Sequence, residues 1–140
     1  MSAHAATGID AADAQRMRTV ATGLSAARAA VGVASLVAPG ISAQIMGFPR
    51  DHDNATARLV GRLFAIREIA LAGYTTTLVR RSTVQPDLYL ANATVDMADL
   101  AVCVLTFLGR RGVARAALGS AVTATPFVAG WLWLRGSCQA

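Results

Sequence analysis

Length, composition and charge narrow the class of protein. The chain has 140 residues, enough for one domain, and 54% of them are hydrophobic while only 15% are charged, against roughly 25% in an average soluble domain. The net charge of +5 comes from arginine, because the sequence contains no lysine. These arginines lie in short groups at the ends of apolar segments, and no basic face interleaved with aromatic residues is formed. The pattern argues against a nucleic-acid partner and is typical of the flanks of membrane spans.

Residues 1–18 are predicted to form a mobile N-terminal tail. They contain Asp10 and Asp13, and no compact apolar core is followed by a small-residue cleavage site. We therefore expect no cleaved signal peptide.

Residues 19–140 contain four apolar stretches of spanning length, which predict an all-α fold, an integral membrane four-helix bundle. The stretches cover residues 19–38, 59–79, 88–108 and 113–134. The connections carry helix-ending and helix-starting residues, with Asp53 or Asn54 as the expected cap of the second helix and Pro86 opening the third. Residues 41–48 are amphipathic enough to lie along the membrane interface. A soluble four-helix bundle is the alternative, but it would need a solvated stripe of Lys and Glu.

The residues flanking the spans bear on orientation. Tyr89, Trp131 and Trp133 are expected at one face, where they would form an interfacial belt with nearby arginines. The arginines divide equally between the two faces, so the positive-inside count does not choose an orientation. The four spans predict a multi-pass protein of the cell membrane. The first helix favours the orientation that places both termini in the cytoplasm. The equal division also permits dual insertion and an antiparallel homodimer.

Five charged residues lie near the middle of the predicted spans. A charge at the centre of a span costs about 2.5–3.5 kcal/mol of insertion free energy, whereas each large apolar residue contributes about 0.3–0.6 kcal/mol. The second span therefore cannot offset its own charges. We predict that charges from three spans pair with one another at the membrane midplane, and these are Arg28, Arg67, Glu68, Asp96 and Asp99.

Helical periodicity gathers polar and small residues into one seam on each of the first three spans. Small residues in such seams let helices approach closely. Arg62 points away from Arg67 and is expected to reach toward water at the helix end. The seams are Ser25, Arg28, Gly32 and Ser35; then Gly61, Ala65, Glu68, Ala72 and Thr75, with Arg67 and Tyr74 on the adjoining stripe; and then Asn92, Asp96, Asp99, Cys103 and Thr106.

The charge count of this cluster predicts acid–base chemistry. Three carboxylates face two guanidiniums, so one carboxyl is expected to hold a proton, with Asp96 and Asp99 as the pair that shares it. The expected reaction is epoxide opening, cyclisation or isomerisation of a lipophilic small-molecule substrate that enters from membrane lipid. An arginine between two aspartates resembles the residue set, though not the fold, of limonene-type epoxide hydrolases. The candidate catalytic residues are Asp96, Asp99, Glu68 and Arg67, and the candidate substrate-binding residues are Arg28, Asn92, Tyr74 and Cys103.

Two readings without catalysis stay open. A buried ionic network can fix helix register in an accessory or assembly subunit of a membrane complex, or carry protons in a small transporter. The size and span number are similar to small multidrug-transporter subunits. Those proteins rely on a glutamate in the first helix, however, where this chain has Arg28.

No metal and no cofactor are expected. Asp51, His52 and Asp53 have the side chains of metal ligands, but three adjacent loop residues are more typical of a solvated helix start. His4 lies in the predicted tail. Cys103 and Cys138 are expected at different depths, too far apart for a disulfide.

The order of motifs resembles a family of small four-span membrane proteins of actinobacteria and fungi. The likeness rests on "GFP" at 47–49, "RLVGRLFAIREIALAGY" at 58–74 and "DMADL" at 96–100, and it covers residues 28–134. A looser likeness is to DoxX-like proteins. The resemblance implies the four-span fold and the importance of the charged residues in these motifs, Arg62, Arg67, Glu68, Asp96 and Asp99. It implies no particular activity.

Overall fold

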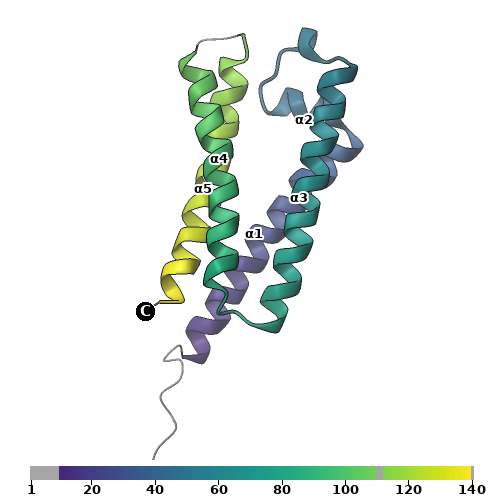
Figure 1. Ribbon diagram of the computed structural model, residues 1–140. Helices are drawn as coiled ribbons and strands as arrows, with labels where there is room; N and C mark the ends of the chain where they lie inside the picture. The colour runs from purple at the N-terminus through teal and green to yellow at the C-terminus, as the bar shows by residue number, and fades with distance from the viewer. Residues whose placement is uncertain (1–9, 110–111, 140) are drawn as a thin grey trace, which may run out of the picture.

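The computed structural model describes residues 10–109 and 112–139, and all of their regular structure is helical (Figure 1). The predicted all-α class is therefore confirmed. The helices are α1 (Ala11–Val37), α2 (Pro39–Ile45), α3 (Ala55–Arg81), α4 (Pro86–Leu108) and α5 (Ala114–Ser137), with a short 3-10 turn at Arg50–His52.

The first helix begins earlier than the sequence pattern indicated. Asp10 caps α1 by accepting hydrogen bonds from the backbone amides of Ala12 and Asp13, so the helix starts at Ala11 and not at residue 19. Residues 10–18, expected in the tail, thus form the cap and first turns of this helix, and residues 1–9 lie outside the described residues. The predicted cap at Asn54 is confirmed, because its side chain accepts from the amide of Ala57.

Within the described residues, three helices are long and apolar enough to cross a membrane: α1, α4 and α5. Helix α3 is as long as α1 but is not among them. The reason is the charge within its apolar stretch, which carries Arg62 in its first part and Arg67 and Glu68 at its middle.

The long helices form two pairs that diverge along their length (Figure 1). Helix α1 packs along α3, α4 packs along α5, and a smaller contact joins α1 to α5. Although α3 and α4 are consecutive in the chain, each has its main contact with another helix. The pairs lie close together near the turn between α3 and α4 and stand apart at the opposite end, where α2 lies.

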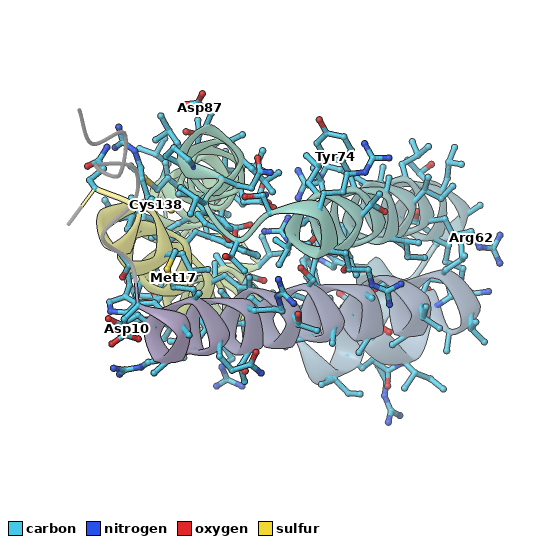
Figure 2. The ribbon with its side chains drawn as sticks, turned by 90° about the horizontal axis from the view of Figure 1, so that it is seen from below. Asp10, Met17, Arg62, Tyr74, Asp87 and Cys138 are labelled. Carbon is cyan, nitrogen blue, oxygen red and sulfur yellow. The ribbon has the colours of Figure 1, made fainter. Side chains whose placement is uncertain are left out.

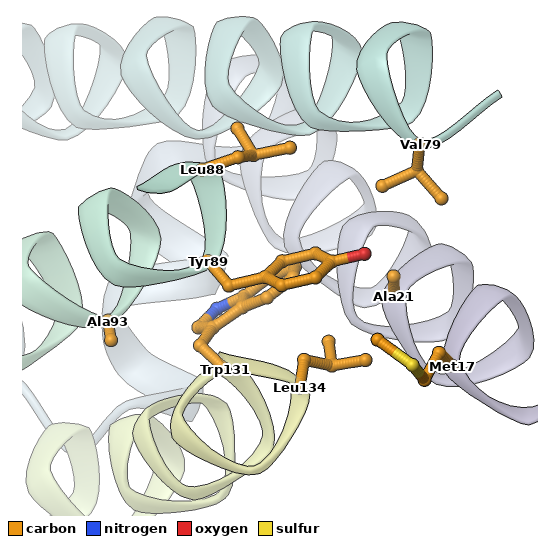
Figure 3. Close-up of a cluster of buried hydrophobic side chains, with 8 residues drawn as sticks. All are labelled: Met17, Ala21, Val79, Leu88, Tyr89, Ala93, Trp131 and Leu134. Carbon is orange, nitrogen blue, oxygen red and sulfur yellow. The ribbon is translucent and has the colours of Figure 1, made fainter. Parts of the chain in front are cut away.

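An apolar core fills the end where the pairs meet (Figure 3). Trp131 and Tyr89 stack with ring centroids 6.2 Å apart, and the Tyr89 hydroxyl donates to the carbonyl of Thr83 at 2.7 Å. The prediction of an interfacial position is wrong for Tyr89 and Trp131, because both side chains are fully buried. Trp133 is partly exposed, and the guanidinium of Arg16 lies over its ring. The core side chains are Met17, Ala21, Val79, Leu88, Tyr89, Ala93, Trp131 and Leu134.

The connection between α1 and α3 bridges the divergent end. Gly47 takes a positive φ of 91° where the chain passes Ala116 of α5, and a Cβ on Gly119 would lie 3.0 Å from the carbonyl oxygen of Met46. This connection therefore reaches from the α1–α3 pair to the start of α5 and covers one side of the space between the pairs. Helix α2 within it exposes Ile41 and Ile45, as an interfacial segment would.

Close packing of α1 on α3 generates a stability prediction for Gly32. A Cβ at this position would lie 2.9 Å from the backbone oxygen of Ala65 and 2.8 Å from Cγ1 of Ile69, so the helices would have to separate. We expect Gly32→Ala to lower the free energy of unfolding in detergent by about 1–3 kcal/mol. Gly23→Ala, on the same helix with nothing within 4 Å, is the control and should raise it by about 0.5–1 kcal/mol. Equal effects of the two changes would contradict the close approach.

Candidate functional site

The central charges of α1 and α4 form a buried ion pair. Arg28 is only 1% exposed, and its Nη2 donates to both carboxylate oxygens of Asp96 at 2.6 and 2.5 Å. Its neighbours on the helix seam, Ser25, Gly32 and Ser35, are also buried, so the predicted seam on α1 is confirmed. The spacing of these residues places Arg28 on the side of α1 that faces the other helices.

Trp131 of α5 completes the surroundings of Asp96. Its indole Nε1 donates to Oδ2 of Asp96 at 2.9 Å, and the Arg28 guanidinium carbon lies 5.9 Å from the ring centroids of both Trp131 and Phe127. This role of Trp131 was not predicted from the sequence. The available signal was its three-residue spacing from the buried Leu134 and four-residue spacing from Phe127, which put all three on one face of α5.

The Arg28 side chain is incompletely hydrogen-bonded. Its Nε and Nη1 are buried without a hydrogen-bond partner among the described residues. Nη1 lies 3.4 Å from Oε2 of Glu68, within ion-pair distance. The guanidinium is thus stabilised by two carboxylates and two aromatic faces, which replace part of its hydration.

Arg67 lies between two carboxylates from different helices. Its Nε and Nη2 donate to Oε1 of Glu68 at 3.1 and 3.0 Å, its Nη1 donates to Oδ1 of Asp99 at 3.2 Å, and its Nη2 also binds Oδ2 of Asp99. The guanidinium carbon lies 5.2 Å from the centre of the Phe64 ring. The side chains of Arg67 and Asp99 are 40% and 39% exposed, whereas that of Glu68 is 9% exposed. This part of the cluster is therefore the more accessible part.

The two groups join into one network of alternating charge. It runs from Asp96 to Arg28, on to Glu68, then to Arg67 and finally to Asp99. The predicted meeting of charges from three helices is confirmed. The predicted Asp96–Asp99 pair is wrong, because each of these aspartates binds a different arginine.

The remaining predicted site residues lie in different places. Asn92 is buried and donates to Oγ1 of Thr75 at 3.1 Å and to the Leu88 carbonyl at 3.0 Å, so it holds α4 to α3. Tyr74 is 62% exposed and points outward, and Arg62 is exposed and points outward as predicted (Figure 2). Cys103 lines a cavity beside the cluster. Of the four predicted substrate-binding residues, only Arg28 and Cys103 reach that cavity.

The cavity occupies the space between the diverging pairs and has a volume of about 1070 Å³. Sites for small molecules usually measure about 300–1,000 Å³. Its surface is mainly apolar, and residues such as Phe64, Val102 and Phe127 come from three helices. Four members of the charged network also line it, namely Arg28, Glu68, Asp96 and Asp99.

A second ion pair lies at the start of α3, where the cavity reaches the α1–α3 connection. Arg58 donates to Asp53 through Nε at 2.8 Å and Nη2 at 3.0 Å. This hydrogen-bonded pairing lowers the pKa of Asp53. His52 and Asn54 line the cavity at the same end.

The described residues hold no group of three or more His, Cys, Asp or Glu side chains placed to bind a metal ion. Comparison of the chain with protein-family models, curated proteins and solved structures finds no match. The chemistry open to the site therefore has to follow from its own geometry.

The two aspartates of α4 should respond differently to neutralisation. Asp96→Asn removes the carboxylate bound to the fully buried Arg28, and we expect a loss of about 3–5 kcal/mol in the free energy of unfolding. Asp99→Asn removes a pair that is more than a third exposed, so its loss should be about 1 kcal/mol or less. Unfolding of both variants in mixed micelles measures the difference. A larger loss for Asp99→Asn would contradict the burial described above.

Proposed function

We propose that the protein is an integral membrane protein spanning the bilayer four times, through α1, α3, α4 and α5. We further propose that it performs acid–base catalysis on a lipophilic small molecule held in the cavity. The observation that carries the catalytic proposal is the acid–arginine–acid arrangement of Glu68, Arg67 and Asp99, whose two carboxyl groups both line a large apolar cavity.

The distribution of polarity supports the membrane proposal. Large apolar side chains on the outer faces of the helices are more than half exposed, while charged residues are buried at the centre. This arrangement is the reverse of a soluble bundle and suits lipid as the solvent. The exposed apolar residues include Val33, Leu63, Ile66, Leu105, Leu108 and Val122.

Helix α3 fits this proposal as the fourth span because its central charges are paired inside the protein. Glu68 and Arg67 bind each other and the network, and Arg62 lies near the helix end, where its long side chain can reach water. The apolar content of α3 alone does not indicate a span. Its insertion depends on partners from α1 and α4.

The exposure of each carboxyl suggests its role. Asp99 is the most exposed of the three acids and is the proposed general base, acting on water or on a substrate hydroxyl. Glu68 is the proposed proton donor, since three carboxyls facing two guanidiniums leave one able to carry a proton. Arg67 orients both. Asp96 is saturated by Arg28 and Trp131, so we propose that it positions Arg28 and does not react.

Epoxide opening illustrates how this arrangement can work. Asp99 takes a proton from water as the water oxygen bonds to an epoxide carbon. The carbon–oxygen bond of the ring breaks, and the epoxide oxygen receives the proton of Glu68. Cyclisation and isomerisation use the same pair of proton transfers without the added water.

A second candidate is a role as a non-catalytic subunit of a membrane complex. The observation in its favour is the buried Arg28–Asp96–Trp131 group, in which the Asp96 carboxylate binds both other side chains, as a group that only holds helices together would. The two candidates differ at Asp99. A purely architectural network has no need of a partly exposed carboxylate on a cavity wall.

Turnover of lipophilic epoxides tests the catalytic proposal. Purified protein in lipid nanodiscs is supplied with terpenoid and long-chain epoxides in ¹⁸O-labelled water, and diol carrying one ¹⁸O is measured by mass spectrometry. We expect Asp99→Asn to lower kcat by about 10²-fold or more while the protein stays folded. Asp87→Asn, a matched change at an exposed position on the same helix, should leave kcat unchanged.

Cyclised or isomerised products without ¹⁸O would support acid–base catalysis at the same site, with cyclisation or isomerisation as the reaction in place of hydrolysis. Equal turnover by the parent protein and by Asp99→Asn would refute the assignment of the base.

A further inference from the structure

The cavity has charged groups at both of its ends and a mainly apolar wall between them. One end holds the carboxyls of Glu68 and Asp99, and the other holds His52, Asn54 and the Asp53–Arg58 pair. The wall between these ends includes Val60, Phe64, Val102 and Phe127. A ligand matched to this lining would be polar at each end and apolar in its middle.

The separation of the two polar ends can be taken along α3. Arg58 and Glu68 are ten residues apart on this continuous helix, which corresponds to roughly 15 Å at the rise of an α-helix. The hydrocarbon core of a bilayer is about 30 Å thick. The cavity thus extends about the depth of one lipid leaflet, from the centre of the helices to the end bearing α2.

The surroundings of the cavity indicate how a membrane molecule would enter. The α1–α3 connection covers the side next to α5, as its contacts with Ala116 and Gly119 show. Helices α3 and α4 flank the cavity without extensive packing on each other, and side-chain bridges join them at Arg67–Asp99 and Thr75–Asn92. The space between α3 and α4 beyond Asp99 is therefore the route with least protein in the way.

The charges around Glu68 and Asp99 limit which polar group of a ligand can bind at this end of the cavity, here called the deep end. Both guanidiniums there are already bound by carboxyls of the network, so none is left to bind an added anion. A neutral hydroxyl can still donate a hydrogen bond to Asp99, and a carbonyl or epoxide oxygen can accept one from the protonated Glu68 of the proposed function. The deep end thus suits a neutral oxygen group.

We propose that the ligand is an elongated amphiphile about one leaflet long, entering between α3 and α4. A neutral oxygen group at one terminus lies against Asp99, and a polar head at the other lies beside residues 52–58. This proposal rests on the proposed function and names the substrate class for the same site.

Protection of Cys103 from alkylation tests the proposal without requiring turnover. Cys103 lines the cavity one helical turn from Asp99, and Cys138→Ser removes the other thiol. The protein in nanodiscs is treated with N-ethylmaleimide, and labelling is read from the intact mass. Three probes of equal carbon number are compared at equal mole fraction in the lipid: an alkane, the 1-alkanol and the α,ω-diol.

We expect the diol to protect Cys103 at about one-tenth of the mole fraction that the 1-alkanol needs, because only the diol has a polar group for each end. The alkane should protect least. Asp99→Ala should remove the advantage of the diol over the 1-alkanol. If this variant does not fold, the comparison of the three probes on the Cys138→Ser protein still tests whether the ligand has a polar group at each end.

Equal protection by the diol and the 1-alkanol, or strongest protection by the alkane, would overturn the two-ended ligand. Failure of Cys103 to react in the ligand-free protein would contradict its place on an open cavity and would also overturn it. Because labelling reports occupancy, a protein that turns over no epoxide but shows the diol preference would refute the catalytic proposal alone.

Discussion

The ion pair of Arg28 with Asp96 is the constraint on which the rest of the structure depends. A guanidinium that is almost fully enclosed by protein is tolerated only when carboxylates and donors from its surroundings replace its hydration. Meeting this requirement brings α1 and α4 together, and the hydrogen bond from Trp131 to the same carboxylate adds α5. Glu68 links α3 to Arg28 and passes the network on to Arg67 and Asp99.

This requirement also explains why the molecule can be tightly packed at one end and hollow at the other. The aromatic core beside the α3–α4 turn and the ionic network together join the two helix pairs, so the pairs can diverge beyond the network without separating. The α1–α3 connection covers one side of the resulting space. The result is a mainly apolar cavity with the paired but partly exposed carboxylate of Asp99 at one end. This carboxylate is the basis of the proposed chemistry.

Much of this arrangement could be predicted because periodicity and the cost of unpaired charge act on the sequence directly. The seam through Arg28 and the small residues facing Gly32 followed from spacing alone. The arginine that each carboxylate binds could not be predicted in this way, because the pairing depends on side-chain rotamers and on the rotation of each helix about its axis. Trp131 was predicted to be an interfacial residue because, like Trp133, it lies near the end of the fourth predicted span, and only the fold distinguishes the buried ring from the exposed one. The cavity arises from the divergence of two helix pairs, which no local pattern encodes.

A double-mutant cycle on the central ion pair tests the account most directly. The free energy of unfolding in mixed micelles is measured for Arg28→Met, Asp96→Leu and the double variant. If each side chain is buried chiefly because of the other, the double variant should lose at least about 2 kcal/mol less than the sum of the two single losses. Losses that add to within about 0.5 kcal/mol would mean that the two residues act independently, and would contradict the account.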